Sequence, residues 1–184
     1  DRLYRRRAIA ETLEPRLLLA SDFEYNASAE TQGVDLRVTS NGDVIELYDQ
    51  TTDSLIKSQL VADNSGFVTI SGSIFDDALT IDDSMVDFDI SFDGGTGVDS
   101  LLGPQLANDW RITAADKGTV NHNVSFDSVE ILTGNAGTTD HFTILDGGSI
   151  SGLIQGNTGD SDRITTEIEA VLLAEGEYTS FEYL

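Results

Sequence analysis

The first clear pattern is an alternation of hydrophobic and polar residues over 34–38, followed by a second apolar segment over 44–48. Such alternation is typical of a half-buried β-strand, because successive side chains point to opposite faces. Asn41-Gly42 lies between the two segments, and this dipeptide accepts the positive φ angles of a tight hairpin turn. The pattern therefore predicts a β-hairpin, with a third strand over 58–62.

From residue 66 onward the hydrophobic residues occur in short groups bounded by Gly, Asn or Asp. The groups contain β-branched and aromatic residues, which favour strands, and the residues between them favour turns. Gly is frequent, with 17 residues, whereas Pro is rare, with 2. The pattern predicts an all-β protein of many short strands, and the apolar groups are 67–70, 79–81, 88–92, 110–112 and 142–145.

One short element recurs along this region: a Gly, a few small residues, an Asp, one further residue and then a large apolar residue. Its four copies begin at Gly72, Gly94, Gly134 and Gly156. Because the middle gap between the aspartates is close to two periods, we expect a degenerate copy at 116–120. The aspartates of the four copies are Asp77, Asp99, Asp140 and Asp162, and the gaps between them are 22, 41 and 22 residues.

A period of about 20–22 residues, built from short strands and Gly corners, suits one coil of a β-solenoid. Successive coils would stack about 4.8 Å apart, with apolar residues inside and Gly at the tight corners. The alternative is a β-sandwich in which the same strands pair antiparallel. The period alone does not separate the two, because a hairpin in a sandwich also approaches 20 residues.

Charge divides the chain into two unequal parts. The whole chain has 33 acidic and 10 basic residues, a formal net charge of −23, but residues 1–16 contain five Arg against three acidic residues. The acidic remainder repels nucleic acid and anionic membranes and attracts cations. The absence of Cys excludes disulfides and thiolate sites, and no apolar run reaches the roughly 20 residues that span a bilayer. We therefore expect neither nucleic-acid binding nor membrane insertion.

The basic N-terminal segment ends in Leu13-Glu14-Pro15-Arg16-Leu17-Leu18-Leu19. Its apolar run has four residues, 17–20, which is shorter than the roughly 7–15 of a cleavable secretory signal. The seven residues match the LEPR-XLL motif, so this segment resembles the N-terminus of giant LEPR-XLL domain-containing repeat proteins of bacteria. The resemblance implies a targeting segment that engages secretion machinery, and a secreted or cell-surface location.

The body of the chain is similar to proteins of the same kind. Residues 33–72 resemble the segment that follows LEPR-XLL, and residues 108–164 resemble a repeat of filamentous-haemagglutinin-like adhesins. The resemblance implies a right-handed parallel β-helix that continues beyond the chain. The expected organisation is a basic helical targeting segment (1–22), a polar linker (23–33), a β-hairpin region that caps the N-terminal end (34–65), and β-solenoid repeats (66–184).

A calcium-binding pattern overlaps the second copy of the repeat. Residues 94–102 fit the G-G-x-G-x-D-x-U-x nonapeptide of RTX-type calcium rolls at every fixed position. Ca²⁺ takes about 6–8 oxygen ligands, which carboxylates and the carbonyls of Gly-rich turns supply. Calcium is therefore the candidate cofactor, and the candidate ligands are Asp77, Gly94, Gly95, Gly97, Asp99, Asp140, Asp160 and Asp162.

One nonapeptide supplies only part of a calcium shell, because RTX sites are shared between consecutive copies. Stacked coils would restore this sharing by placing Asp77 over Asp99 and Asp140 near Asp162. The alternative is that these aspartates form Asx-type turns and stay solvated, without a metal.

Other chemistry has weaker support in the sequence. His122 and His141 lie 19 residues apart without a further ligand pattern, which disfavours a zinc site. Trp110 at the start of a strand is expected in the core, and no G-x-S-x-G elbow is present. A polysaccharide-cleaving set of carboxylates, with Arg111 or Arg163 as a basic partner, would come from Asp76, Asp77, Asp82 and Asp83.

These observations favour a non-catalytic structural and adhesive module of a large secreted or cell-surface bacterial repeat protein, stiffened by calcium. Such a module would display distal domains that contact extracellular polysaccharide, or a host or neighbouring cell surface. Two alternatives stay open: a calcium-responsive binding domain that folds on export, and a polysaccharide-active β-helix enzyme.

Overall fold

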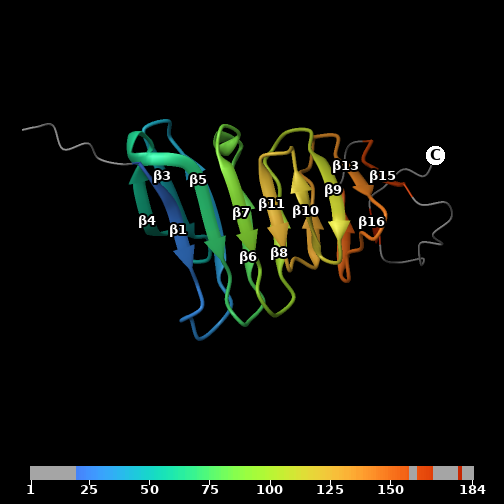
Figure 1. Cartoon of the computed structure of the whole chain (residues 1–184), viewed down its shortest axis with the longest axis horizontal. Coiled ribbons are helices and arrows are strands. Elements are labelled where there is room, and N and C mark those ends of the chain that lie inside the picture. Colours follow the sequence, from blue (N-terminus) through green and yellow to red (C-terminus); the bar gives the residue numbers. More distant parts are fainter. Residues whose placement is uncertain (1–19, 158–160, 168–177, 180–184) are drawn as a thin grey trace, which may run out of the picture.

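The computed structural model describes residues 20–157, 161–167 and 178–179, which form an all-β structure, as the sequence predicts (Figure 1). Their strands form two sheets, which we name sheet A and sheet B. Sheet A contains, in spatial order, β1 (Ser21–Asn26), β5 (Asn64–Ser71), β7 (Asp89–Asp93), β11 (Val124–Asp127), β10 (Lys117–Val120), β9 (Asp109–Ala114), β13 (His141–Ile144) and β15 (Arg163–Thr166). Sheet B contains β16 (Tyr178–Thr179), β14 (Leu153–Gln155), β12 (Ile131–Thr133), β8 (Ser100–Leu102), β6 (Ala78–Ile81), β2 (Asp35–Ser40), β3 (Val44–Asp49) and β4 (Ser54–Leu60).

The chain repeatedly leaves one sheet, enters the other and returns. Strands β5, β6, β7 and β8 belong alternately to sheets A and B. In the described part of the chain, ten strand pairings are parallel and four are antiparallel. The 22-residue spacing seen in the sequence reappears as strand register, because it separates the partners Phe67 and Asp89, Ala78 and Ser100, Ile131 and Leu153, and His141 and Arg163.

Sheet A contains one irregular segment, in which β9, β10 and β11 form an antiparallel meander (Figure 1). On its two sides the parallel pairing resumes, since β11 pairs with β7 and β9 pairs with β13. The predicted degenerate repeat at 116–120 is wrong, because Lys117–Val120 is the middle strand of this meander. Asp116 has a φ of 52° and turns the chain back between β9 and β10, so it serves a hairpin within one sheet.

The predicted hairpin is confirmed, because β2 and β3 pair antiparallel. The Asn41 side chain accepts hydrogen bonds from the backbone N–H groups of Asp43 and Val44, at 3.0 and 2.9 Å. Gly42 has a φ of 92°, which explains the Asn-Gly signal. The third strand is β4, which begins at Ser54 and therefore lies earlier than predicted, because it pairs with nearly the whole of β3. The 3-10 helix η1 (Val61–Asp63) follows it.

The polar linker predicted over 23–33 is wrong in its first part, because Ser21–Asn26 forms β1 and pairs in parallel with β5. Phe23 is fully buried in this strand. Side chains of β4 reach across to β1: Lys57 Nζ donates to Glu24 O, and Gln59 Nε2 donates to Ser21 O at 2.9 Å. Phe23, Tyr25 and Ala27 alternate with polar residues and pack into or against the core, so a short period-2 pattern was present and the prediction overlooked it.

The core lies between the sheets, and the strands of sheet A present alternate side chains to it. Trp110 is fully buried and stacks on Phe142, with ring centroids 5.1 Å apart and an interplanar angle of 12°. Its predicted place in the core is thus confirmed. In β9, Trp110 and Ile112 are buried, whereas Asp109 and Arg111 between them are half-buried on the outer face.

Candidate functional site

Acidic and amide side chains form two columns at opposite edges of the molecule. The chain leaves sheet A at the carboxyl ends of its parallel strands and returns to it at their amino ends, so the two kinds of crossing lie at opposite edges. We call the residues at the crossings into sheet B the first column: Asp77, Asp99 and Glu130. We call the residues at the crossings into sheet A the second column: Asn108, Asp140 and Asp162.

In the first column, each carboxylate accepts a hydrogen bond from a backbone N–H of the neighbouring pass of the chain. Val34 N donates to Asp77 Oδ1, and Asp77 N donates to Asp99 Oδ1, both at 2.7 Å. Asp99 N donates to Glu130 Oε2, also at 2.7 Å. These charge-assisted bonds link successive passes of the chain beside the backbone hydrogen bonds that Ser100 N and Glu130 N donate to Asp77 O and Asp99 O.

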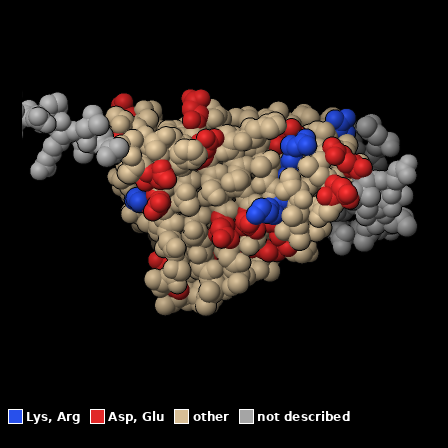
Figure 2. Space-filling view, in the orientation of Figure 1, with Lys and Arg blue, Asp and Glu red and all other residues tan. Residues whose placement is uncertain are grey.

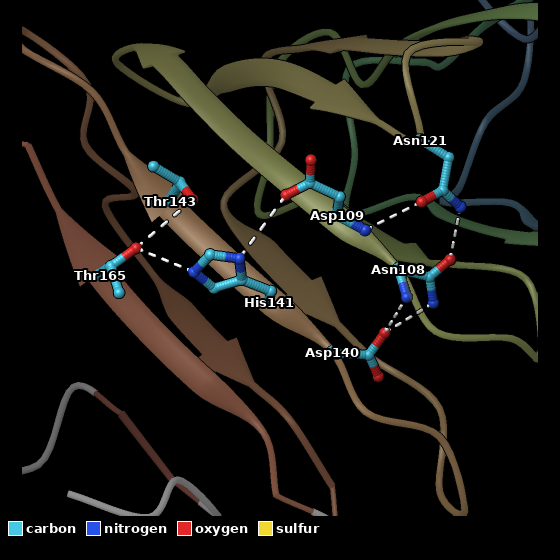
Figure 3. A network of polar contacts seen from close by, with 7 residues as sticks. All are labelled: Asn108, Asp109, Asn121, Asp140, His141, Thr143 and Thr165. Carbon is cyan, nitrogen blue, oxygen red and sulfur yellow. Dashed lines mark hydrogen bonds and ion pairs between the residues drawn. The ribbon is translucent and has the colours of Figure 1, made fainter. Parts of the chain in front are cut away.

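The second column repeats this arrangement with an amide as its first member (Figure 3). Asn108 N and Asn108 Nδ2 both donate to Asp140 Oδ1, at 3.0 and 2.7 Å. Asp140 N in turn donates to Asp162 Oδ1 at 2.8 Å. Sequence analysis predicted that Asp77 would stack with Asp99 and Asp140 with Asp162, and these contacts confirm both pairs.

The idea that these aspartates stay solvated is wrong, because Asp77, Asp99, Asp140 and Asp162 are at most 2% exposed. The Gly that precedes each one by five or six residues explains how they are buried. A Cβ added at Gly72, Gly94, Gly134 or Gly156 would lie 2.2–2.6 Å from Oδ2 of the following Asp. Each carboxylate therefore folds over its own Gly, and this contact is the physical basis of the repeated Gly and Asp.

Sequence analysis missed two members of the columns, Asn108 and Glu130. Asn108 follows Gly103 by five residues, which is the spacing between Gly94 and Asp99, but it carries an amide in place of the carboxylate. Glu130 stands directly before the strand β12 and is reached without a preceding Gly corner. A search for Gly followed, five or six residues later, by any side chain with an oxygen acceptor would have found Asn108. Glu130 has no such signal in the sequence.

Burial changes the acidity of the columns. It raises the pKa of Asp99 to about 6, and the nearby charges of Asp77, Glu130 and Asp76 add to the effect, although the hydrogen bond from Asp77 N opposes it. Asp99 Oδ2 is buried and has no hydrogen-bond partner among the described residues. Burial also raises the pKa of Asp140, but there the hydrogen bonds from Asn108 favour the ionised form.

The predicted calcium ligands are divided between the two edges. Asp77, Gly94, Gly95, Gly97 and Asp99 belong to the first edge, Asp140 and Asp162 belong to the second, and Asp160 lies outside the described residues. Both oxygens of Asp77 already accept hydrogen bonds, from Val34 N, Ser73 N and Ser73 Oγ. In the described part of the chain, no group of three or more acidic or His side chains is placed to hold a metal ion.

The four carboxylates considered for polysaccharide cleavage do not form one set. Asp76 and Asp77 precede β6, whereas Asp82 and Asp83 follow it, so the strand separates the two pairs. Asp76 Oδ1 accepts from Val98 N at 2.8 Å, and Asp82 Oδ1 accepts from Ser84 N at 3.0 Å. Asp76 thus links two passes of the chain that are 22 residues apart, and Asp82 caps the start of η2 (Asp83–Met85).

A separate polar cluster lies on the outer face of sheet A, across β9, β13 and β15 (Figure 3). His141 Nε2 and Thr165 Oγ1 are 3.0 Å apart, and Thr143 Oγ1 lies 3.4 Å from the same hydroxyl. On the other side of the ring, His141 Nδ1 is 3.8 Å from Asp109 Oδ1. Burial and the positive charge of Arg163 lower the pKa of His141, while Asp109 opposes them, so the ring is neutral at pH 7.

Comparison with protein-family models, curated proteins and solved structures found no match to this chain. In the described ranges, no helix has the length and apolar character required to cross a bilayer. The proposed targeting segment (1–22) lies outside the described residues except for its last three positions. The resemblance to LEPR-XLL proteins therefore stays a prediction from the sequence.

Proposed function

We propose that this chain is a non-catalytic structural module of a large secreted or cell-surface repeat protein, built as a right-handed parallel β-solenoid. The observation that carries the proposal is the parallel pairing of strands 22 residues apart, with a return through the other sheet between partners. A parallel pair joined by such a crossover is almost always right-handed. In a stack of this kind each coil contacts its neighbours, and the structure extends in one direction.

The corner columns support a mechanical role. A force along the chain would have to break the strand ladders and also the bonds from one corner to the next, such as Asp77 N to Asp99 Oδ1 and Asp140 N to Asp162 Oδ1. Hydrogen bonds to a charged group contribute about 1.5–3 kcal/mol each. The columns would thus hold the coils at the edges, together with the hydrogen bonds that Gly72 N, Gly94 N and Gly134 N donate to the neighbouring pass.

The cellular part of the proposal rests on the LEPR-XLL resemblance. Residues 1–22 would direct the parent protein to secretion machinery, and the parent would contact extracellular polysaccharide or another cell surface. A reporter carrying residues 1–22 should reach the cell exterior in a bacterium that exports such proteins. The control is a reporter in which Leu17, Leu18 and Leu19 are replaced by Ser, expressed at the same level. If the unmodified reporter stays inside the cell as the control does, this cellular part of the proposal is contradicted and the structural part is unaffected.

Mechanical unfolding of the full chain between two handles tests the structural part. A solenoid should lose coils one at a time, so the contour length should grow in several steps. Each coil of 22 residues should add about 75 Å, and the longer coils that contain the β2–β4 hairpins or the meander should add more. A sandwich should yield in a single step, because its antiparallel strands share one core. A single release of the whole described region would therefore contradict the proposal.

We also propose that calcium strengthens the first column, and the observation in its favour is Asp99. No group in the described part of the chain donates to its buried Oδ2, and the acidic side chains of Asp77 and Glu130 lie nearby. A cation there would offset the repulsion among the three groups. The effect of calcium on the melting temperature tests this second proposal.

A further inference from the structure

Two arginines differ from the other cationic side chains in the described residues. Lys117 pairs with Asp127, Arg37 pairs with Asp53 at 3.4 Å, and Lys57 donates to a backbone carbonyl of β1. The guanidinium groups of Arg111 and Arg163 form no ion pair or hydrogen bond with another described residue. In a chain of net charge −23, carboxylates are abundant, so two unpaired guanidinium groups require an explanation.

Both arginines belong to the outer face of sheet A and flank the His141 cluster. Arg111 of β9 is in register with Thr143 of β13, which is in register with Thr165 of β15. Arg163 is the register partner of His141 on β15 and is close enough to lower the pKa of its ring. Figure 2 shows Lys and Arg side chains gathered toward the right of the view, where Figure 1 places β9, β13 and β15.

Hydroxyl groups lie between the two arginines. Thr143 is only 7% exposed, so its hydroxyl has a fixed surrounding, and it lies 3.4 Å from the Thr165 hydroxyl. When His141 Nε2 carries a proton it donates to Thr165 Oγ1, and the Thr165 proton then becomes free for another acceptor. The cluster therefore combines two positive groups with a hydroxyl that can donate outward.

We propose that this face binds an oxyanion, a sulfate, phosphate or carboxylate group, between Arg111 and Arg163 and over the hydroxyls of Thr143 and Thr165. Guanidinium groups bind such anions through paired N–H donors, which a Lys does not provide. His141 acts as a positioning residue, because its Nε2 proton decides which way the Thr165 hydroxyl donates. The site stands on its own contacts and does not depend on the proposed structural role.

Asp109 provides a variant for which the proposal predicts stronger anion binding. Its carboxylate lies on the Nδ1 side of His141, whereas Thr165 lies on the Nε2 side, so the ring separates the carboxylate from the proposed anion (Figure 3). Its negative charge still weakens anion binding at this distance. Removing it should strengthen binding, whereas removing either Arg should weaken it.

The experiment is a titration of the full chain with sodium sulfate against sodium chloride at a constant ionic strength of about 0.15 M, read by NMR at the Thr143 and Thr165 amides. Sulfate should bind saturably, Arg111→Gln and Arg163→Gln should each weaken it about tenfold, and Asp109→Asn should strengthen it about threefold. Lys117→Gln is the matched control, because it removes a positive charge from the same sheet outside the cluster. No saturable shift, or an equal loss in Lys117→Gln, would overturn the proposal.

The pH dependence of the same titration tests the role of His141. The charged groups that act on its ring are Asp109 from β9 and Arg163 from β15. Sulfate does not titrate between about pH 8 and pH 5.5, so tighter binding at the lower pH would come from His141 protonation. His141→Gln should remove this dependence and keep the arginine effects. Binding that is independent of pH in the unmodified chain would contradict the positioning role.

Oligosaccharides of equal length distinguish the source of the anion. Tighter binding of a sulfated or uronic-acid oligosaccharide than of free sulfate would place the group on a glycan, whereas equal affinity would identify a free ion. Both results require loss of binding in Arg111→Gln. A neutral oligosaccharide that binds as tightly as the charged ones would show sugar recognition without the anion and would overturn the proposal.

Discussion

Apart from Glu130, the members of the two columns use the same corner, a Gly followed by a buried side chain, yet Asp140 and Asp99 have different surroundings. Asp140 of the second column accepts hydrogen bonds at both oxygens, from Asn108 at one and from Asn135 N and Thr138 Oγ1 at the other. Asp99 of the first column has acidic neighbours on both sides and one oxygen without a donor among the described residues. The number of hydrogen-bond donors around a corner carboxylate, more than its burial, decides whether its ionised form is stabilised.

The largest expected difference between the edges concerns their glycines. A Cβ at Gly94 would lie 2.1 Å from the backbone oxygen of Ser128 on the next pass of the chain, so Gly94→Ala must push two coils apart. The nearest atoms to a Cβ at Gly134 all belong to the Asp140 side chain, so Gly134→Ala displaces one buried side chain and does not press on the backbone of another pass. We expect Gly94→Ala to lower the free energy of unfolding by more than about 3 kcal/mol and Gly134→Ala by about 2 kcal/mol, because the displaced carboxylate loses hydrogen bonds. Urea denaturation measures both, and equal losses would contradict the contrast.

The next difference appears when each charge is removed without a change of shape. Asp140→Asn places an amide group among donors, so we expect a loss of about 2 kcal/mol. Asp99→Asn keeps the oxygen that accepts from Asp77 N and removes a desolvated charge, so its stability at pH 7 should stay within about 1 kcal/mol of the unmodified chain. Thermal and urea denaturation of the two variants side by side test this. A greater loss of unfolding free energy in Asp99→Asn than in Asp140→Asn would contradict the claim that Asp140 is the better stabilised carboxylate.

A smaller effect should follow from pH. The folded pKa of Asp99 is raised to about 6, above its usual value, so the folded protein binds a proton more readily than the unfolded chain. The stability from this group is fully present below the unfolded pKa of about 3.9 and is lost as pH rises to about 6. Above that the contribution is flat. The urea midpoint of Asp99→Asn, relative to that of the unmodified chain, should therefore be higher at pH 7 than at pH 4. A relative midpoint that does not vary with pH would contradict the raised pKa of Asp99.

Calcium should have the smallest effect. A weak site at Asp99, half to mostly filled at millimolar Ca²⁺, would stabilise the fold by about 1 kcal/mol. For a chain of this length the melting temperature should rise by about 2–4 °C over that in chelator. Asp99→Asn should abolish the rise, whereas Asp162→Asn at the other edge should keep it. An equal response in both variants would mean that calcium acts through the general acidic charge.

Sequence reasoning recovered the hairpin, several further strands and the 22-residue spacing, because these depend on local features. The Asn-Gly turn, the short apolar groups and the Gly-to-Asp corners each have a signature within a few residues. The 41-residue gap misled the analysis, because Asp99 and Asp140 stand at opposite edges and the meander β9–β11 lies between them. The 41-residue gap is close to twice the repeat length by coincidence and does not contain a further copy of the repeat.

The surroundings of Asp99 and His141 could not be predicted from the sequence for a different reason. Whether Asp99 is solvated or buried depends on Asp77, Glu130 and the backbone of other passes, and no local pattern encodes that. His141 looked isolated because its partners Asp109 and Thr165 are 32 and 24 residues away in the chain. They meet only through strand register, which a search for short motifs does not see.

Amide hydrogen exchange at the two corners tests the central claim, that each buried carboxylate fastens the neighbouring coil. In the unmodified chain the amides of Asp77 and Asp140 should be protected, since each donates to a carboxylate of the next coil. Asp99→Ala should remove protection at Asp77 and leave Asp140 protected, and Asp162→Ala should do the reverse, with the core amide of Trp110 as reference. Protection of Asp77 that persists in Asp99→Ala would contradict the claim.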